Sequence, residues 1–219
     1  MTGRRVRQLV FFGLVLLQAG ASRAQDHEPG RFDYYVLVLS WTPTYCAHEG
    51  DERGDRQCTA RRRHGFTLHG LWPQYFDGWP QDCWSGKRPW VPEPVIEAMR
   101  DIMPSKSLVI HEYREHGTCA GLSPEDYFSV SRDLYERIEI PSRFAAPDDP
   151  LVLPPETIER EFLQANSWLK PEMMSVTCRK GALLDVRICF GRDLAPRACG
   201  RNEERRVCRA PSTTIPSSD

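Results

Sequence analysis

The chain has 219 residues, with 29 Lys and Arg against 30 Asp and Glu, a formal net charge of −1 and eight cysteines. A protein that coats nucleic acid passively is usually basic overall, so this balance excludes that class and leaves only a local, catalytic contact with nucleic acid. No apolar run is long enough to span a bilayer, so we expect no membrane-embedded segment.

Residues 1–24 have the three parts of a secretory signal peptide: a basic start, a short apolar run and a small-x-small cleavage site ending at Ala24. We therefore expect an exported protein, either periplasmic or secreted. Residues 25–209 are long enough for one domain with its own core. Residues 210–219 are rich in Ser, Thr and Pro, which predicts a disordered tail.

All eight cysteines follow the predicted signal peptide, and an even count in an exported chain indicates disulfides. Eight cysteines can pair in about a hundred ways, so their spacing alone does not choose a connectivity. A zinc cluster is the alternative, but the chain has no C-x-x-C pair, which argues against it.

The first element after the signal is Phe32–Trp41, rich in β-branched and aromatic residues. This composition predicts a central strand covered on both faces. Cys46 and Cys58 enclose a polar, charged stretch that we expect to be a surface loop closed by a local bridge. The basic run Arg61–Arg63 fits two roles equally well, attraction of a phosphate backbone or a solvated strand edge.

The stretch 65–74 alternates apolar and polar residues, which predicts a half-buried strand with His69 on the face opposite Phe66 and Leu68. Gly70 allows another group to approach the backbone closely, and Pro73 is expected to end the strand. Taken alone, this pattern favours an ordinary surface histidine.

The stretch His111–Cys119 predicts a short helix that ends at Gly117, because glycine accepts positive φ. Glu112 and His116 are four residues apart and share a helix face. A carboxylate beside an imidazole orients the ring and raises its pKa, as a proton-transferring histidine requires. Taken alone, the stretch favours a charged, solvated helix end.

A metalloenzyme is a weaker hypothesis for the same residues. The HExxH pattern of zinc metalloproteases is absent. This hypothesis would use His69, His111, Glu112 and His116 as ligands.

The remaining patterns predict an α+β fold in one domain, with an antiparallel β-sheet core and helices packed on one side. An N-cap serine followed by proline begins the first of the later helices. The expected elements are a loop-rich link at 75–110, helices at 123–140 and 155–168, a hairpin at 174–190 and a closing strand at 207–208.

The two histidine stretches together resemble the active-site segments of the ribonuclease T2 family. Phe66–Pro73 is similar to the first segment and His111–Cys119 to the second, in the family's order and at a family-like separation. The resemblance weakens after about Pro150. It implies a disulfide-stapled domain with the pairs Cys46–Cys58, Cys83–Cys119, Cys178–Cys208 and Cys189–Cys199.

The resemblance also implies an endoribonuclease for single-stranded RNA that needs no metal or cofactor. His116 would be the general base and His69 the general acid. Glu112 would orient His116 and aid the charged phosphorane, and His111 would bind the phosphate. The products would be 2′,3′-cyclic phosphate ends and then 3′-phosphate ends. We expect a monomer with RNA as its partner.

This chain departs from the family at two positions. Glu115 stands where the family usually has lysine, and an ionised carboxylate repels phosphate. Either Arg114 or the run Arg61–Arg63 compensates, or activity is reduced. The alternative is therefore a catalytically weakened secreted protein that binds RNA or a host partner. Gln74 stands where the family commonly has an acid, which leaves base preference open, with Trp72 as the base-stacking candidate.

Overall fold

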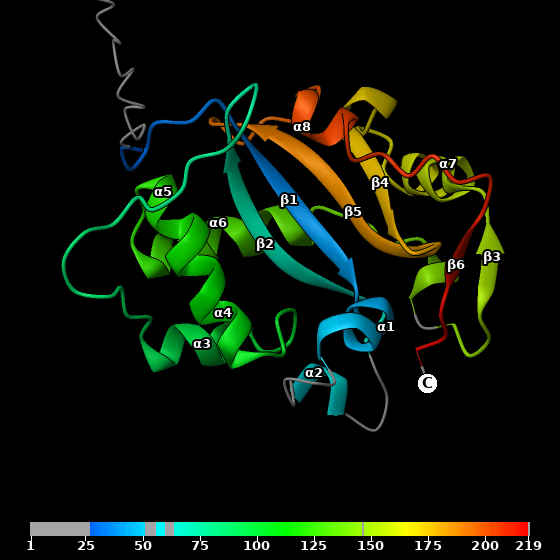
Figure 1. Cartoon of the computed structure of the whole chain (residues 1–219), viewed down its shortest axis with the longest axis horizontal. Coiled ribbons are helices and arrows are strands. Elements are labelled where there is room, and N and C mark those ends of the chain that lie inside the picture. The colour runs from blue at the N-terminus through cyan, green and yellow to red at the C-terminus, as the bar shows by residue number, and fades with distance from the viewer. Residues whose placement is uncertain (1–26, 51–55, 60–63, 146, 219) are drawn as a thin grey trace, which may run out of the picture.

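The computed structural model describes residues 27–50, 56–59, 64–145 and 147–218 (Figure 1). The predicted signal peptide and the run Arg61–Arg63 lie outside the described residues. Six strands of the described residues form one sheet in the order β2-β1-β5-β6-β3, with β4 paired to the other side of β5. Every pairing is antiparallel except the single contact between β5 and β6.

The predicted central strand is confirmed as β1, Tyr34–Trp41, which lies between β2, Phe66–Gln74, and β5, Ala182–Gly191. All eight of its residues are buried. One face of β1 contributes to the main core and the other to a small cluster with Cys189. The main-core residues are Tyr35, Leu37, Leu39 and Trp41.

The predicted hairpin is also confirmed, as β4, Met174–Arg179, and β5. Its turn has positive φ at both Lys180 (51°) and Gly181 (82°). A two-residue turn of this kind matches the right-handed twist of the flanking strands. The turn sets the pairing of Arg179 with Ala182, and a register shift between Thr177 and Cys178 then places Asp185 opposite Thr177 and Arg187 opposite Ser175.

Helices cover the main-core face of the sheet, where α6 packs against β1 and β2 and α7 against β4 (Figure 1). Ser123 caps α6 by accepting a hydrogen bond from the Asp126 amide, as the sequence predicts, although α6 ends at Glu136 rather than near Ile140. The longer helices are α3, Glu93–Met99; α4, Lys106–Glu112; α6, Pro124–Glu136; and α7, Pro155–Ala165. The stretch 75–110 thus contains α3 and the start of α4, and is not only a loop-rich link.

Short helical turns connect these elements. They are α1, Thr42–Tyr45; η1, Cys46–Gly50; α2, Arg56–Thr59; η2, Tyr113–Gly117; α5, Thr118–Ala120; η3, Ser142–Phe144; η4, Pro171–Met173; and α8, Arg201–Glu204. No helix in the described part of the chain is both long and apolar enough to cross a membrane.

The prediction of a disordered tail at 210–219 is wrong for most of that stretch. Thr213–Ile215 form strand β6, which pairs with β3, Leu151–Leu153. Ile215 is fully buried, and the Trp41 indole donates a hydrogen bond to the Pro216 carbonyl. The β-branched run 213–215 outweighs the Ser/Thr/Pro composition, because its alternation buries two side chains.

The predicted closing strand at 207–208 is also wrong. The Cys208 amide donates to the Val176 carbonyl, but Cys208 lies outside the strands, and the sheet continues instead through β6.

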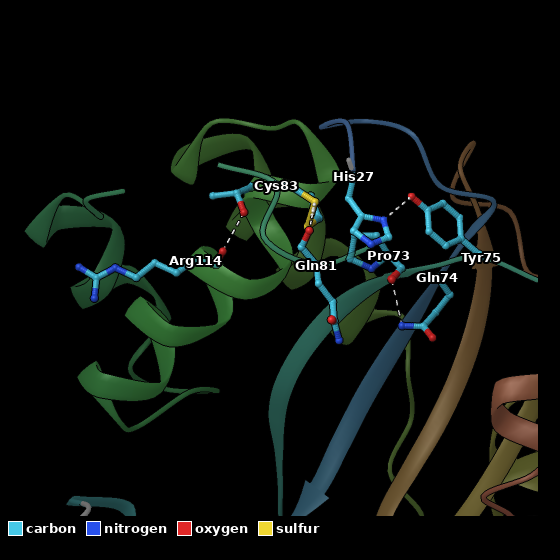
Figure 2. The surroundings of a disulfide bond; sticks show 9 residues. His27, Pro73, Gln74, Tyr75, Gln81, Cys83 and Arg114 are labelled. Atoms are coloured by element: carbon cyan, nitrogen blue, oxygen red, sulfur yellow. Dashed lines mark hydrogen bonds between the residues drawn. A yellow bond between two sulfur atoms is a disulfide. The ribbon is translucent and has the colours of Figure 1, made fainter. Parts of the chain in front are cut away.

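Four disulfides staple the domain, with the pairing that the family resemblance implies: Cys46–Cys58, Cys83–Cys119, Cys178–Cys208 and Cys189–Cys199. Figure 2 shows the surroundings of Cys83, whose bridge joins the loop after β2 to α5. This bridge fixes the end of the histidine-bearing helix relative to the histidine-bearing strand.

The packing of β6 leads to a stability prediction. Replacing Ile215 with Ala removes a fully buried side chain and should lower the free energy of unfolding by about 2–5 kcal/mol. Thr214→Ala, on the exposed face of the same strand, is the control and should change it by less than about 0.5 kcal/mol. Urea unfolding followed by tryptophan fluorescence measures both. Equal, negligible effects of the two substitutions would show that the tail does not pack.

Candidate active site

His69 occupies a β-bulge in β2. Val38 on β1 pairs with Gly70, and Leu39 pairs with Leu68, so His69 is the extra residue between two paired ones. A bulge of this kind bends the strand and re-aims one side chain, and bulges are frequent beside active sites. Leu68 is therefore fully buried, while the side chain of His69 is 25% exposed.

The second histidine stretch is helical but does not end at Gly117. The chain passes from α4 through one π-helical turn, η2, into α5, and the left-handed residue that ends it is Gly121, with φ of 72°. Gly117 is required for space, because a Cβ there would overlap the Tyr113 ring and lie 3.1 Å from Tyr127 Cγ. A π-turn inside an α-helix is frequent at functional sites.

The structure brings His69, Glu112 and His116 together. Glu112 is the last residue of α4, and its side chain is 1% exposed. Its Oε1 lies 3.3 Å from His69 Nε2, and its Oε2 lies 3.8 Å from His116 Nε2. One buried carboxylate therefore lies between two partly exposed imidazoles from different elements.

Trp72 holds this group in place. Its indole Nε1 donates a 2.8 Å hydrogen bond to Glu112 Oε2. The ring stacks on His116, with 5.1 Å between centroids and 27° between planes, and meets His69 edge-on at 5.3 Å. The Arg187 guanidinium lies over the same indole, 5.1 Å from its centroid. The Trp72 indole is thus already in contact with His69, Glu112 and His116. These contacts favour a role in positioning those side chains over a role in stacking on a base of the substrate.

Gly70 provides the space for Glu112. A Cβ at Gly70 would overlap Glu112 Oε2 and lie 2.8 Å from Glu112 Cδ and 2.9 Å from Trp72 Nε1. The close approach expected at Gly70 is therefore the approach of the carboxylate itself.

The environment separates the pKa values of the two histidines. Burial acts to lower the pKa of His69, but the negative charge of Glu112 beside it, with help from Asp185, raises it above the ordinary value. Burial lowers the pKa of His116 to about 4, and the more distant Glu112 does not reverse this. Glu112 acts to raise the pKa of His116, as expected, but desolvation outweighs its charge at 3.8 Å and the net shift is downward.

Glu112 itself remains ionised. Burial acts to raise its pKa, but His69, His116 and the Trp72 hydrogen bond together lower it below the ordinary value. Glu112, which the sequence predicts to orient His116, is thus closer to His69.

A polar chain behind His69 was not predicted from the sequence. Ser40 Oγ lies 2.9 Å from His69 Nδ1 and donates a 2.6 Å hydrogen bond to Asp185 Oδ1. Asp185 Oδ2 in turn lies 3.1 Å from Arg187 Nη2. Two features of the sequence could have indicated this chain: Ser40 interrupts an apolar strand, and Asp185 and Arg187 are charged residues within the strand 182–191.

A cavity of about 200 Å³ adjoins His116. Gln74 lies in its wall with both ends of its amide engaged: Nε2 donates to the Pro73 carbonyl, and Oε1 accepts from Asn202. The lining residues are Trp72, Gln74, Trp79, His116, Arg187, Glu203 and Arg206.

The remaining predicted site residues lie differently. His111 is exposed near the end of α4. Arg114 Nε donates to the Pro89 carbonyl, and Figure 2 shows its side chain extending away from Pro73 and Gln74 at the end of β2. Glu115 is exposed. Among the described residues, no group of three or more His, Cys, Asp and Glu side chains is arranged to hold a metal ion.

Comparison with known proteins gives a consistent assignment. A model of the ribonuclease T2 family matches residues 32–199. A ribonuclease from Aeromonas hydrophila is 39% identical over 139 residues, which are 63% of this chain and 61% of that protein. A probable ribonuclease from Haemophilus influenzae is 31% identical over 129 residues, 53% of this chain and 47% of that protein. The chain thus spans less than two thirds of the length of these two relatives.

Solved structures share the fold. An RNase-related protein from Calystegia sepium superposes with a TM-score of 0.67 and 24% identity, covering 86% of this chain and 99% of that one. RNase NT in complex with 5′-AMP superposes with a TM-score of 0.54 and 22% identity, covering 78% of this chain and 96% of that one.

The close contact at Gly70 leads to a second prediction. Gly70→Ala should displace the Glu112 carboxylate, shift the Trp72 indole N–H signal in the NMR spectrum and lower the free energy of unfolding by about 1–3 kcal/mol. In a Glu112→Ala background the overlap is relieved, so most of that cost should disappear. An equal cost in both backgrounds, with an unchanged Trp72 signal, would contradict this geometry.

Proposed function

Because the chain belongs to the ribonuclease T2 family, whose model matches residues 32–199, we propose that it is an endoribonuclease for single-stranded RNA. Cleavage gives 2′,3′-cyclic phosphate ends, which are then hydrolysed to 3′-phosphate ends. The observation that carries this proposal is the buried Glu112 carboxylate 3.3 Å from His69 and 3.8 Å from His116.

RNA brings its own nucleophile, the 2′-OH beside the scissile phosphate. The reaction needs a base to remove the 2′-OH proton and an acid to protonate the leaving 5′-oxygen, and two histidines serve both needs without a metal. His116, whose pKa is about 4, is neutral at neutral pH and accepts the proton. His69, whose pKa is raised, retains its proton and donates it. Environments that push two pKa values apart assign the acid and the base.

The remaining groups support the proton transfer from His69 and the negative charge that develops on the phosphate. Glu112 keeps His69 protonated and is itself held by Trp72. His111 binds the phosphate in this proposal. Arg187 lines the same cavity as His116 and takes the charge-neutralising role for which the sequence offers Arg114 or the run Arg61–Arg63. Arg206 lines the same cavity.

A second candidate function is a catalytically weakened protein that binds RNA or a host partner on the same scaffold. The exposed Glu115 and the engagement of Arg114 with the Pro89 carbonyl favour it. The two candidates differ in turnover. In both, residues 1–24 direct export to the periplasm or outside the cell, and the four disulfides suit an oxidising compartment.

The direct test uses the oxidised protein without residues 1–24, a short RNA and a chelator, with mass spectrometry of the new ends. His69→Ala and His116→Ala should each slow cleavage by at least about 100-fold, because each removes a proton-transfer group. His64→Ala, at an exposed histidine outside the site, is the control and should cleave like the wild type.

Cyclic phosphate ends that persist in chelator and are lost in both histidine variants would support the enzyme. A folded wild type that cleaves no RNA at any pH would reject it in favour of the binding protein, and Glu115→Lys would then be expected to gain activity.

The pH dependence follows from the two pKa shifts. The base is active only above the pKa of His116, about 4, and the acid is active only below the raised pKa of His69. Cleavage should therefore fall as pH drops through about 4 and fall again as pH rises above the ordinary histidine range. A profile of kcat/KM against pH in constant ionic strength measures both limbs. A rate that keeps rising through neutral pH into the alkaline range would show that His69 is not the acid.

A further inference from the structure

Ser40 is a polar residue in an otherwise apolar strand. Along β1, Tyr34, Val36 and Val38 point to the face opposite the main core, and Ser40 continues that series. The serine is 6% exposed and pairs in register with Asp185 of β5. It therefore lies between the bulged residue of β2 and a buried carboxylate.

The hydrogen bonds around Ser40 have only one consistent direction. A serine hydroxyl has a single proton to donate and lone pairs with which to accept. That proton goes to Asp185 Oδ1 at 2.6 Å. The 2.9 Å contact between Ser40 Oγ and His69 Nδ1 must then be donated by the histidine. Nδ1 of His69 therefore carries a hydrogen in both the neutral and the charged ring.

The opposite ring nitrogen is left for proton exchange. With Nδ1–H directed at Ser40, His69 Nε2 faces Glu112 Oε1 at 3.3 Å. Nε2 is bare in the neutral ring and protonated in the charged ring. The orientation of a histidine that transfers protons is commonly set in this way by the bond that its other nitrogen makes.

The Asp185 carboxylate is itself held on its far side. Its Oδ2 lies 3.1 Å from Arg187 Nη2, and Thr177 Oγ1 donates to the same oxygen at 3.3 Å. Asp185 is 3% exposed, so its position is set by these neighbours. The chain from His69 through Ser40 to Asp185 is thus anchored at its buried end.

We propose that Ser40 and Asp185 are positioning residues for His69, which hold its ring as the Nδ1–H tautomer and leave Nε2 as the proton-exchanging nitrogen. The tautomer and the orientation stand on the hydrogen bonds alone. The consequence for catalysis rests on the proposed function, in which His69 is the general acid.

The charges that face His69 come from three elements. Glu112 approaches from α4, Asp185 and Arg187 from β5, and His116 from η2. Glu112 and Asp185 raise the pKa of His69, whereas Arg187 lowers it. Loss of the Asp185 charge should therefore lower this pKa.

A merely structural role is the competing explanation, since a bond between Ser40 and Asp185 would also join β1 to β5. Stability measurements do not separate the two explanations. The tautomer of His69 separates them, because a bond that only joined the strands would not determine which ring nitrogen of His69 carries the hydrogen.

The test is a two-bond proton–nitrogen NMR spectrum of the oxidised, nitrogen-15-labelled protein without residues 1–24, recorded across pH. In the wild type, neutral His69 should be the Nδ1–H form. Ser40→Ala should raise the population of the Nε2–H form and lower the pKa of His69. If RNA is cleaved, kcat should fall by about 10–100-fold, with KM changed less than about twofold.

Ser175→Ala is the matched control. Ser175 is 4% exposed on β4, in register with Arg187, and its Oγ has no hydrogen-bond partner in the described part of the chain. The Ser175→Ala substitution also removes a buried serine hydroxyl from this sheet, but this hydroxyl does not contact His69. Its spectrum, pH profile and kcat should match the wild type.

Two further variants keep the test decisive if Ser40→Ala folds poorly. Ser40→Thr retains the hydroxyl and should restore the Nδ1–H form, and Asp185→Asn should lower the pKa of His69. A Ser40→Ala protein that keeps a pure Nδ1–H form and the wild-type pKa would overturn the proposal. So would an unchanged pKa in Asp185→Asn.

The failure of one proposal can be told from the failure of the other. If the wild type cleaves no RNA, the proposed function fails, whereas the tautomer and titration data still decide the role of Ser40 and Asp185. If RNA is cleaved but the tautomer does not respond to Ser40→Ala, only the positioning proposal fails.

Discussion

A buried carboxylate between two imidazoles is the constraint on which the site depends. An ionised carboxylate removed from water is costly unless charged partners and hydrogen bonds compensate it. Glu112 is 1% exposed and has His69, His116 and the Trp72 indole around it. The charged His69 and the hydrogen bond from Trp72 compensate the buried negative charge, so the position of the carboxylate depends on theirs.

The backbone is shaped around this charge. The bulge in β2 re-aims His69 toward it, and the missing side chain at Gly70 leaves room for its oxygens. The π-turn that follows Glu112 carries His116 on the same helix. The Cys83–Cys119 bridge then ties that helix to the segment after β2. The bulge in β2 and the π-turn after α4 therefore both bring a histidine to the Glu112 carboxylate.

The two histidines are unequal because the carboxylate lies closer to one of them. His69, at 3.3 Å, gains enough from the negative charge to overcome its desolvation, whereas His116, at 3.8 Å and beside other histidines, does not. Asp185 adds to the effect of Glu112 at His69, whereas the neighbouring His69 and His111 lower the pKa of His116 further. This asymmetry is the physical support for the roles proposed here.

Features of the fold and the site that follow local sequence patterns could be predicted, and features that depend on contacts between distant residues could not. Periodicity and capping located β1, the hairpin and α6, and the two motifs located His69, Glu112 and His116. Ser40 and Asp185 are 145 residues apart, so no local pattern joins them. The pKa of His116 depends on desolvation by the folded chain, and the packing of β6 depends on its pairing with β3. Both were misjudged for that reason.

The most direct test of the central carboxylate is a histidine NMR titration of Glu112→Gln, with the exposed Glu115→Gln as control. The account predicts that the pKa of His69 falls below its wild-type value in Glu112→Gln, since the main cause that raises it is removed, and stays unchanged in Glu115→Gln. A His69 that titrates at its wild-type pKa without the Glu112 charge would contradict the account.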